Sequence, residues 1–281
     1  MESVYGEREM SELENLSDGI EPGSDAPPID VDANGYVIRH LTTAAEMRSL
    51  IDVFQQVWGS ATELVRLEML MAIAHSGGYV TALYATEGRE EPAILGASVG
   101  ILARHRGRPA LHSHVTGVLP GARRHGLGRR MKLHQRDWAI QNGLEWIVWT
   151  FDPLVRRNAW FNIAVLGTVV EEYVESFYGT MTDALNSGDV SDRLVVGWDL
   201  SDDPDGPLLD GTDVDGSPLP DVELIPTPED VVTLRRTDPG AVAEWRADHR
   251  RRLEPALAAG RRVLGFTRDG HYVVALDGSG R

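Results

Sequence analysis

The stretch that most restricts the fold of this chain is Val118–Gly128, with the sequence V-L-P-G-A-R-R-H-G-L-G. A run of strand character precedes it, and a run with helical periodicity follows it and stops at Gly143. The stretch is therefore a turn from a strand into a helix. Glycines at 126 and 128 let a ligand approach the main chain, and a helix N-terminus favours an anion. We expect a pyrophosphate-binding loop here; the alternative is a glycine-rich turn that only caps the helix.

The elements on both sides of this loop predict an α+β fold with a mixed sheet around one core. Antiparallel strands come first, and a strand–helix–strand crossover follows. Thr43 is a candidate N-cap, with Glu46 three residues later as in a capping box. The expected strands are 36–41, 79–84, 94–103, 110–118, 146–150, 169–178 and 193–200, and the expected helices are 44–58, 64–75, 126–142 and 156–166.

Two acidic segments divide the chain into four parts. Residues 1–32 hold ten acidic side chains and one base, Arg8, and residues 201–230 hold ten acidic side chains and no base. We expect 1–33 to be a disordered tail and 201–221 to be a linker rich in Asp, Gly and Pro. Between them lies a main domain, 34–200. A smaller segment, 222–281, follows, with a strand at 222–225, a helix at 239–257 and a hairpin at 262–276, and we expect it to pack on the main domain.

Composition excludes several classes of protein. The chain has no cysteine, so it has no disulfide, thiolate metal site or cysteine nucleophile, and its histidines lack metal-ligand spacing. No apolar run reaches the length of a membrane span, and the N-terminus lacks the apolar stretch of a signal peptide. The formal charge of −16 and the absence of aromatic residues from the basic run Arg123–Lys132 argue against nucleic acid binding. We expect a cytoplasmic protein without a metal ion.

The loop resembles the acetyl-coenzyme A motif of the GNAT superfamily of N-acyltransferases. That motif, Q/R-x-x-G-x-G/A, is matched by Arg123, Gly126 and Gly128. Ala139, Gly143 and the pair Ile147-Val148 continue the match, which covers about residues 36–200. Within the superfamily, the run from Trp149 to Gly167 is similar to a branch of predicted acetyltransferases that also carries L-H-S-H before the loop and a C-terminal extension.

The resemblance implies acetyl-CoA or another acyl-CoA as co-substrate and an amine as acceptor. It implies that backbone amides of about 124–129 hold the pyrophosphate, and that the pantetheine lies along the strand ending at Val118, where that strand diverges from 146–150. Asn158 and Asn162 lie on the helix that contacts CoA in this family; the alternative for Asn158 is a helix-start residue. The implied cofactor-binding residues are Val118, Arg123, Arg124, His125, Gly126, Leu127, Gly128, Arg129, Asn158 and Asn162.

Three residues are candidates for catalysis. The resemblance places a general base on the strand before the loop, at His112, and His114 lies two residues further on the same side. Asp152 follows the next strand and could orient His112 or bind the acceptor amine. The alternatives are core histidines and an aspartate that starts a turn before Pro153.

The chain departs from the family at the position of the usual acid, a tyrosine four residues before the glycine that ends the helix. Counting back from Gly167 gives Ile163, which carries no proton to donate. Tyr173, Tyr178 or water could protonate the leaving thiolate instead. Two functions stay open: an acyl-CoA-dependent N-acyltransferase, and a CoA-binding module without catalysis. The segment 222–281 could shape the acceptor pocket or form the contact of a homodimer.

Overall fold

The computed structural model describes residues 35–59, 63–86, 93–179, 189–201 and 221–276, without the side chains of 124 and 125. The expected acidic tail and all but the ends of the expected linker lie outside these ranges. Within them, no helix is long and apolar enough to cross a membrane.

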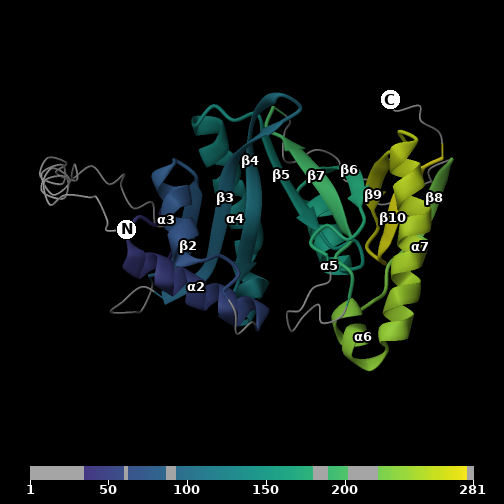
Figure 1. Cartoon of the computed structure of the whole chain (residues 1–281), viewed down its shortest axis with the longest axis horizontal. Helices are drawn as coiled ribbons and strands as arrows, with labels where there is room; N and C mark the ends of the chain where they lie inside the picture. Colours follow the sequence, from purple (N-terminus) through teal and green to yellow (C-terminus); the bar gives the residue numbers. More distant parts are fainter. Residues whose placement is uncertain (1–34, 60–62, 87–92, 180–188, 202–220, 277–281) are drawn as a thin grey trace, which may run out of the picture.

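A seven-stranded sheet forms the main body, in the order β1-β2-β3-β4-β5-β7-β6 (Figure 1). The β4–β5 pair is parallel and the other pairs are antiparallel, so the mixed, mostly antiparallel α+β sheet predicted from the sequence is confirmed. The strands are β1 (Tyr36–His40), β2 (Tyr79–Ala85), β3 (Ala93–His105), β4 (Arg108–Val118), β5 (Trp146–Phe151), β6 (Val169–Val174) and β7 (Arg193–Asp199).

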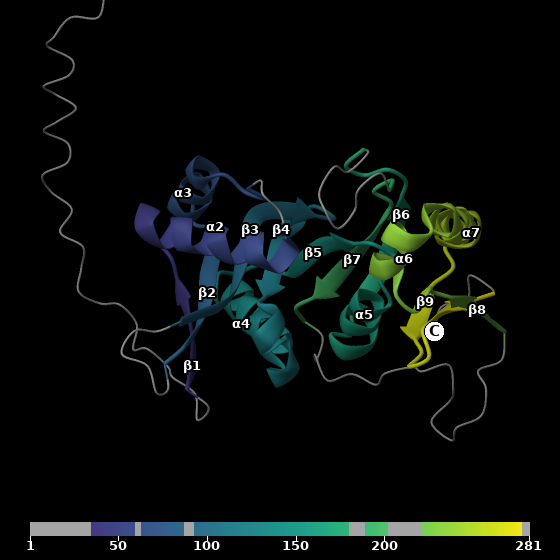
Figure 2. The ribbon, with the colours of Figure 1, turned by 90° about the horizontal axis from the view of Figure 1, so that it is seen from below.

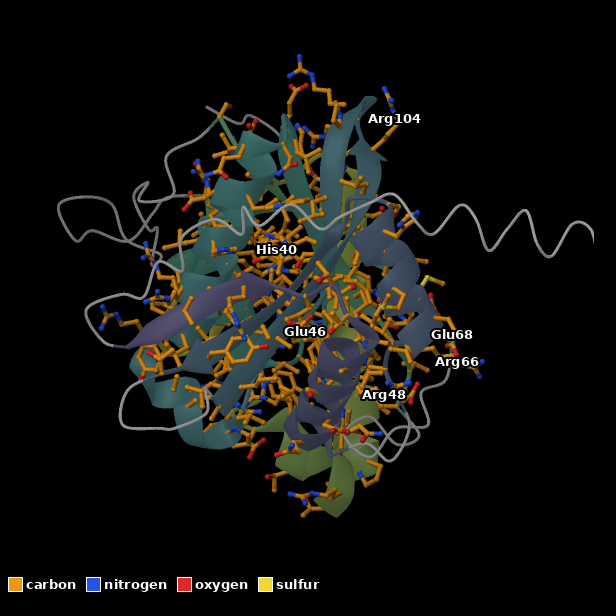
Figure 3. All side chains as sticks on the ribbon, turned by 90° about the vertical axis from the view of Figure 1, so that its left-hand side faces the viewer. His40, Glu46, Arg48, Arg66, Glu68 and Arg104 are labelled. Atoms are coloured by element: carbon orange, nitrogen blue, oxygen red, sulfur yellow. The ribbon has the colours of Figure 1, made fainter. Side chains whose placement is uncertain are left out.

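Helices cover both faces of this sheet. Figure 2 shows α2 (Ala44–Trp58) and α3 (Leu67–His75) on one face, and α4 (Leu127–Gln141) and α5 (Arg156–Ala159) on the other. The predicted capping box of α2 is confirmed, because Thr43 Oγ1 accepts from the Glu46 amide and Glu46 accepts from the Thr43 amide. Charged residues of the α2–α3 region, among them Arg48, Arg66 and Glu68, are exposed on the side seen in Figure 3.

The helix expected at 156–166 has a different form. Only Arg156–Ala159 is α-helical, and Trp160–Val165 continues as a π-helix, η2. The amide of Leu166 accordingly bonds to the carbonyl of Phe161, five residues back. Because the winding changes, the side chains of Trp160–Val165 point in other directions than a continuous α-helix would give them.

The C-terminal segment forms a second, three-stranded sheet in the order β8-β10-β9. Its strands are β8 (Val222–Pro226), β9 (Val263–Phe266) and β10 (His271–Ala275), and its helices are α6 (Val231–Thr237) and α7 (Pro239–Ala258). Ile225, Phe266 and Tyr272 share one buried cluster with Trp149 and Trp198 of the main sheet. The segment is therefore joined to the main body by a common apolar core.

Candidate active site

The centre of the candidate site is the place where β4 and β5 separate. The two strands pair only at Ala110–Trp146, Leu111–Ile147 and His112–Val148. Beyond these pairs β4 continues to Val118 and β5 continues to Phe151 without hydrogen bonds between them, and Figure 1 shows the two strands running apart. Backbone groups on the facing edges are thus available to an extended ligand that enters between the strands.

A bulge in β4 lies at the same level. Val99 of β3 is opposite Val115 and Gly100 is opposite Ser113, so His114 has no opposite residue in β3. A bulge of this kind re-aims side chains and leaves backbone groups outside the ladder. The rings of His112 and His114 lie 6.2 Å apart at this level, measured between ring centroids.

The expected phosphate loop is a short 3-10 helix, η1 (Pro120–His125), followed by Gly126 and the start of α4 at Leu127. Gly126 has φ 69°, a left-handed conformation that side-chain-bearing residues rarely adopt. A Cβ on Gly126 would meet no atom within 4 Å, and one on Gly128 would meet only Phe161 Cζ at 3.9 Å. The space beside these glycines is therefore open, next to the first amides of α4, which have no partner within the helix.

Two arginines place positive charge beside this loop. Arg123 Nε donates to the Val118 carbonyl at 3.1 Å, which holds the loop against the end of β4. Partial burial and the nearby Arg157 guanidinium lower the pKa of Arg123. Two like charges held close together repel each other, and an anion that binds between them relieves this repulsion. The Arg129 side chain is also part of the described structure, whereas those of Arg124 and His125 are not.

His112 lies half-buried on β4, and its environment favours the neutral imidazole. Burial, then His114, then Lys132 lower its pKa, and burial lowers the pKa of His114. Leu111 and Ser113 contact the face of the sheet that carries α4, since Leu111 shares a cluster with Ala139 and Ser113 bonds to Lys132. Because neighbouring residues of a strand alternate, His112 points to the opposite face.

Asp152 has partners other than those expected from the sequence. Its carboxylate accepts from Arg246 Nη1 at 2.8 Å and Nη2 at 3.1 Å, and also from Arg235 and from the amide of Leu154 at 2.9 Å. These arginines outweigh the effect of burial and hold its pKa at about 2. The expectation that Asp152 orients His112 or binds an amine is thereby replaced, because its oxygens are occupied by arginines of α6 and α7.

The two asparagines after β5 also differ in their surroundings. Asn158 is half-buried at the start of α5, where its amide bonds to the Val155 carbonyl at 2.8 Å. Asn162 is buried in η2, and its Oδ1 accepts from Trp149 Nε1 at 3.1 Å. Ile163 is 6% exposed and lies in the main core cluster, so it fills the core.

Lys132 is a residue of this site that the sequence pattern did not reveal. In the sequence it is only the last residue of the basic run Arg123–Lys132 after the loop. In the structure it is 5% exposed on α4, where its Nζ donates to Ser113 Oγ at 2.8 Å and to Gln135 Oε1 at 3.2 Å. One signal could have identified it: Lys132 is the only lysine in a chain whose 27 basic side chains are otherwise arginine.

A cavity of ≈ 320 Å³ lies between η2 and the C-terminal segment. Arg157 lines it and is also the residue whose charge acts on Arg123. The Arg268 guanidinium lies 5.8 Å from the centroid of the Trp160 ring. The remaining lining residues are Arg156, Glu229 and Phe266.

No family model and no curated protein matches this chain. Solved structures match it in part. The NatC complex bound to Gag peptide and CoA matches with a TM-score of 0.47 and 14% identity, over 58% of this chain and 98% of that chain. The ribosomal-protein-S5-alanine acetyltransferase from Vibrio fischeri matches with a TM-score of 0.47 and 15% identity, over 61% and 96%. The ribosomal-protein-S18-alanine N-acetyltransferase from Escherichia coli matches with a TM-score of 0.44 and 14% identity, over 62% and 99%.

The loop between β4 and α4 lies where the motif predicts a turn from a strand into a helix, and the parallel pair β4–β5 is the crossover expected from the sequence. The chain thus has a mixed α+β fold, and its loop between β4 and α4 carries the residues by which the sequence resembles the GNAT superfamily.

Proposed function

We propose that this chain is an acyl-CoA-dependent N-acyltransferase that moves an acyl group, in the simplest case acetyl, to an amine of a small molecule or peptide. The observation that carries the proposal is the junction of the separated strands with the loop. After His112 and Val148, β4 and β5 leave their facing edges unpaired, and β4 leads directly into the Gly126 turn and the N-terminus of α4.

This junction suits the two ends of an acyl-CoA. The pantetheine arm carries two amide groups, which can pair with the free edge of β4. The pyrophosphate can lie on the first amides of α4, with Arg123 and Arg157 beside it. Arg157 also faces the ≈ 320 Å³ cavity, whose Trp160 and Arg268 suit a purine ring and a phosphate.

His112 is the proposed general base. The neutral acceptor amine attacks the thioester carbonyl carbon, a carbon–nitrogen bond forms, and the carbon–sulfur bond breaks. His112 takes the proton from the attacking nitrogen, directly or through one water. Because the pKa of His112 is lowered, its base form is present at neutral pH.

Calorimetric titration with acetyl-CoA tests the binding part of this proposal. Gly126→Trp would place an indole in the space proposed for the pyrophosphate and should abolish the heat of binding. Gly143→Trp is a matched control, because Gly143 ends the same helix with φ 70° and also has no atom within 4 Å of a Cβ. Equal loss in both variants, or no binding of any acyl-CoA to the unaltered protein, would contradict the proposal.

A second candidate is a CoA-binding module without catalysis. The burial of Ile163 where the family count expects an acid favours it, as does the engagement of Asp152 by arginines. Release of CoA thiol across a set of amines distinguishes the two functions. Turnover that is lost in His112→Ala supports the enzyme, and acyl-CoA binding without turnover for any amine supports the module.

A further inference from the structure

The ammonium group of Lys132 lies at the point where the two central strands separate. Its Nζ is 2.8 Å from Ser113 Oγ and 3.7 Å from the centroid of the Trp149 ring. Ser113 and Trp149 are the residues that directly follow the last β4–β5 pair, His112 and Val148. The lysine thus bridges the first unpaired position of each strand, from the face of the sheet that carries α4.

The surroundings of this ammonium offer hydrogen-bond acceptors but no compensating charge. Its contacts are Ser113, Gln135 and the face of Trp149, and no carboxylate lies within ion-pair distance of it among the described residues. Burial lowers its pKa from 10.5 to about 7. A buried lysine without an acidic partner is costly to the folded state, which points to a role that needs it.

The charges near Lys132 come from few elements. On β4, His112 is coupled to it electrostatically. On β5, β3 and η2 the neighbouring groups are Trp149, Ser98 and Asn162, which do not titrate; Ser98 bonds to Gln135 and Asn162 bonds to Trp149. On α4 itself, His134 and Arg136 lie two and four residues further along.

The choice of lysine at this position is specific. Lys132 is the only lysine among the 27 lysine and arginine residues of the chain. The others are arginines, which keep their proton under all ordinary conditions. The chain's only lysine side chain, with a pKa of about 7, is placed where the strands part. An arginine would supply the same charge there, but it could not transfer a proton.

We propose that Lys132 is the catalytic acid that donates a proton to the departing CoA sulfur, in place of the tyrosine that this chain lacks. The inference rests on the proposed acyltransferase function. As the carbon–sulfur bond breaks, the thiolate sulfur takes one proton from Nζ, leaving a neutral amine. Lys132 then regains a proton from water, and His112 returns to water the proton it took from the acceptor. The net products are one amide and one CoA thiol.

The positions of the two groups fit separate roles. His112 points to the face covered by α2 and α3, whereas Lys132 approaches from the face of α4. A thioester held between the strands would have a base on one side and an acid on the other. Transfer from the lysine is downhill, because a thiol is an intrinsically weaker acid than a buried lysine with a lowered pKa.

The single lysine permits a test that does not depend on turnover. Protein labelled with ¹³C at the lysine Cε gives one side-chain signal, whose pH titration measures the pKa of Lys132 in the intact chain. Saturation with CoA should change the shape of this titration relative to saturation with desulfo-CoA, because a thiol close enough to exchange a proton with the amine titrates with it as a coupled pair. Identical titrations with both bound compounds would overturn the inference and leave the proposed function standing. If neither compound binds, the proposed function itself fails.

Kinetics provide the second test. In the unaltered protein kcat should fall as pH rises through the pKa of Lys132, because the acid form is lost. Lys132→Arg keeps the charge but cannot transfer the proton, so it and Lys132→Met should both lower kcat by on the order of 10²-fold while the KM for acyl-CoA changes little, and the residual activity should lack the alkaline limb. Arg136→Met, one turn along the same helix, is the control and should keep the limb. An alkaline limb that is unchanged in Lys132→Arg would contradict the assignment, since a purely structural lysine would leave it in place.

Discussion

Arg246 of α7 binds both carboxylate oxygens of Asp152, at 2.8 and 3.1 Å, and so joins the C-terminal segment to the end of β5. Both side chains are almost fully buried, and Arg246 also bonds to Asp189. Asp152 is therefore a link between the two sheets, located one residue beyond the strand that carries Trp149.

Removing this link should destabilise the protein strongly. Asp152→Ala leaves Arg246 and Arg235 buried with one carboxylate fewer, and we expect a loss of about 3 to 5 kcal/mol in the free energy of unfolding. Asp152 has a lowered pKa of about 2, so its stabilisation is present above about pH 4 and is lost as pH falls towards 2. Denaturant unfolding followed by circular dichroism measures the loss.

Asp248→Ala is the control for this prediction. Asp248 pairs with Arg251 and Arg252 at the surface, so its removal should cost less than about 1 kcal/mol. If the two variants lose similar stability, the Asp152 cluster does not anchor the segment.

Lys132 should make the stability depend on pH in a defined interval. Its pKa is about 7 in the folded chain and 10.5 ordinarily, so between these values the unfolded chain binds a proton that the folded chain does not. The free energy of unfolding then rises with pH, by at most about 1.4 kcal/mol per unit. Lys132→Met should remove this rise and be more stable than the unaltered protein at pH 7, with the gap narrowing towards pH 10. Parallel curves for the two proteins would refute the lowered pKa; Arg136→Met should retain the rise.

His112 should set the acid limb of the activity profile. Burial and two neighbouring bases lower its pKa below 6.5, so activity should stay high at pH 6.5 and fall only at more acidic pH. His112→Ala should lower kcat by on the order of 10²- to 10⁴-fold. His114→Ala tests the neighbour, and retention of activity there would assign the role of base to His112. A larger loss in His114→Ala than in His112→Ala would reverse that assignment.

Restoring the family's tyrosine should not restore its chemistry. Ile163 is 6% exposed in the main core cluster, so Ile163→Tyr adds volume to a packed site and should cost about 1 to 3 kcal/mol without raising kcat. Ile163→Leu, which conserves volume, is the control. Faster turnover in the tyrosine variant, with an alkaline limb near the pKa of tyrosine, would show that position 163 faces the thioester after all.

The main elements followed from local patterns. The loop between Val118 and Gly128 predicted the strand, turn and helix around it, and Thr43 with Glu46 predicted the start of α2. These signals concern residues close in sequence, where side-chain spacing and capping act directly on the backbone. The sequence did not predict the helix α6, which is a single short element between Pro226 and Pro239. It depends on the Asp230 carboxylate, which accepts from the Thr233 amide, and on packing against α7.

The winding of 156–165 could not be derived from the sequence, since an α-helix and a π-helix have the same apolar composition. The consequence is practical: five residues, not four, separate Leu166 from the carbonyl that it bonds. Counting four residues back from Gly167 assigns Ile163 to the position of the acid. In the structure Ile163 is buried, and the side chain of the preceding residue, Asn162, bonds to Trp149.

By itself the sequence determined the glycine turn at Gly126 and Gly128, the strand before it and the helix after it. A left-handed turn residue and the start of a helix depend on residues that are close together in the sequence. The tertiary structure decided which polar groups meet at the separation of β4 and β5. Asp152 is held by arginines about 80 to 95 residues away in sequence, and Lys132 reaches Ser113 and Trp149 from a different element. Burial and charge at such contacts arise only when distant segments pack together, and they turn one aspartate into an anchor and the only lysine into a group that titrates near neutral pH.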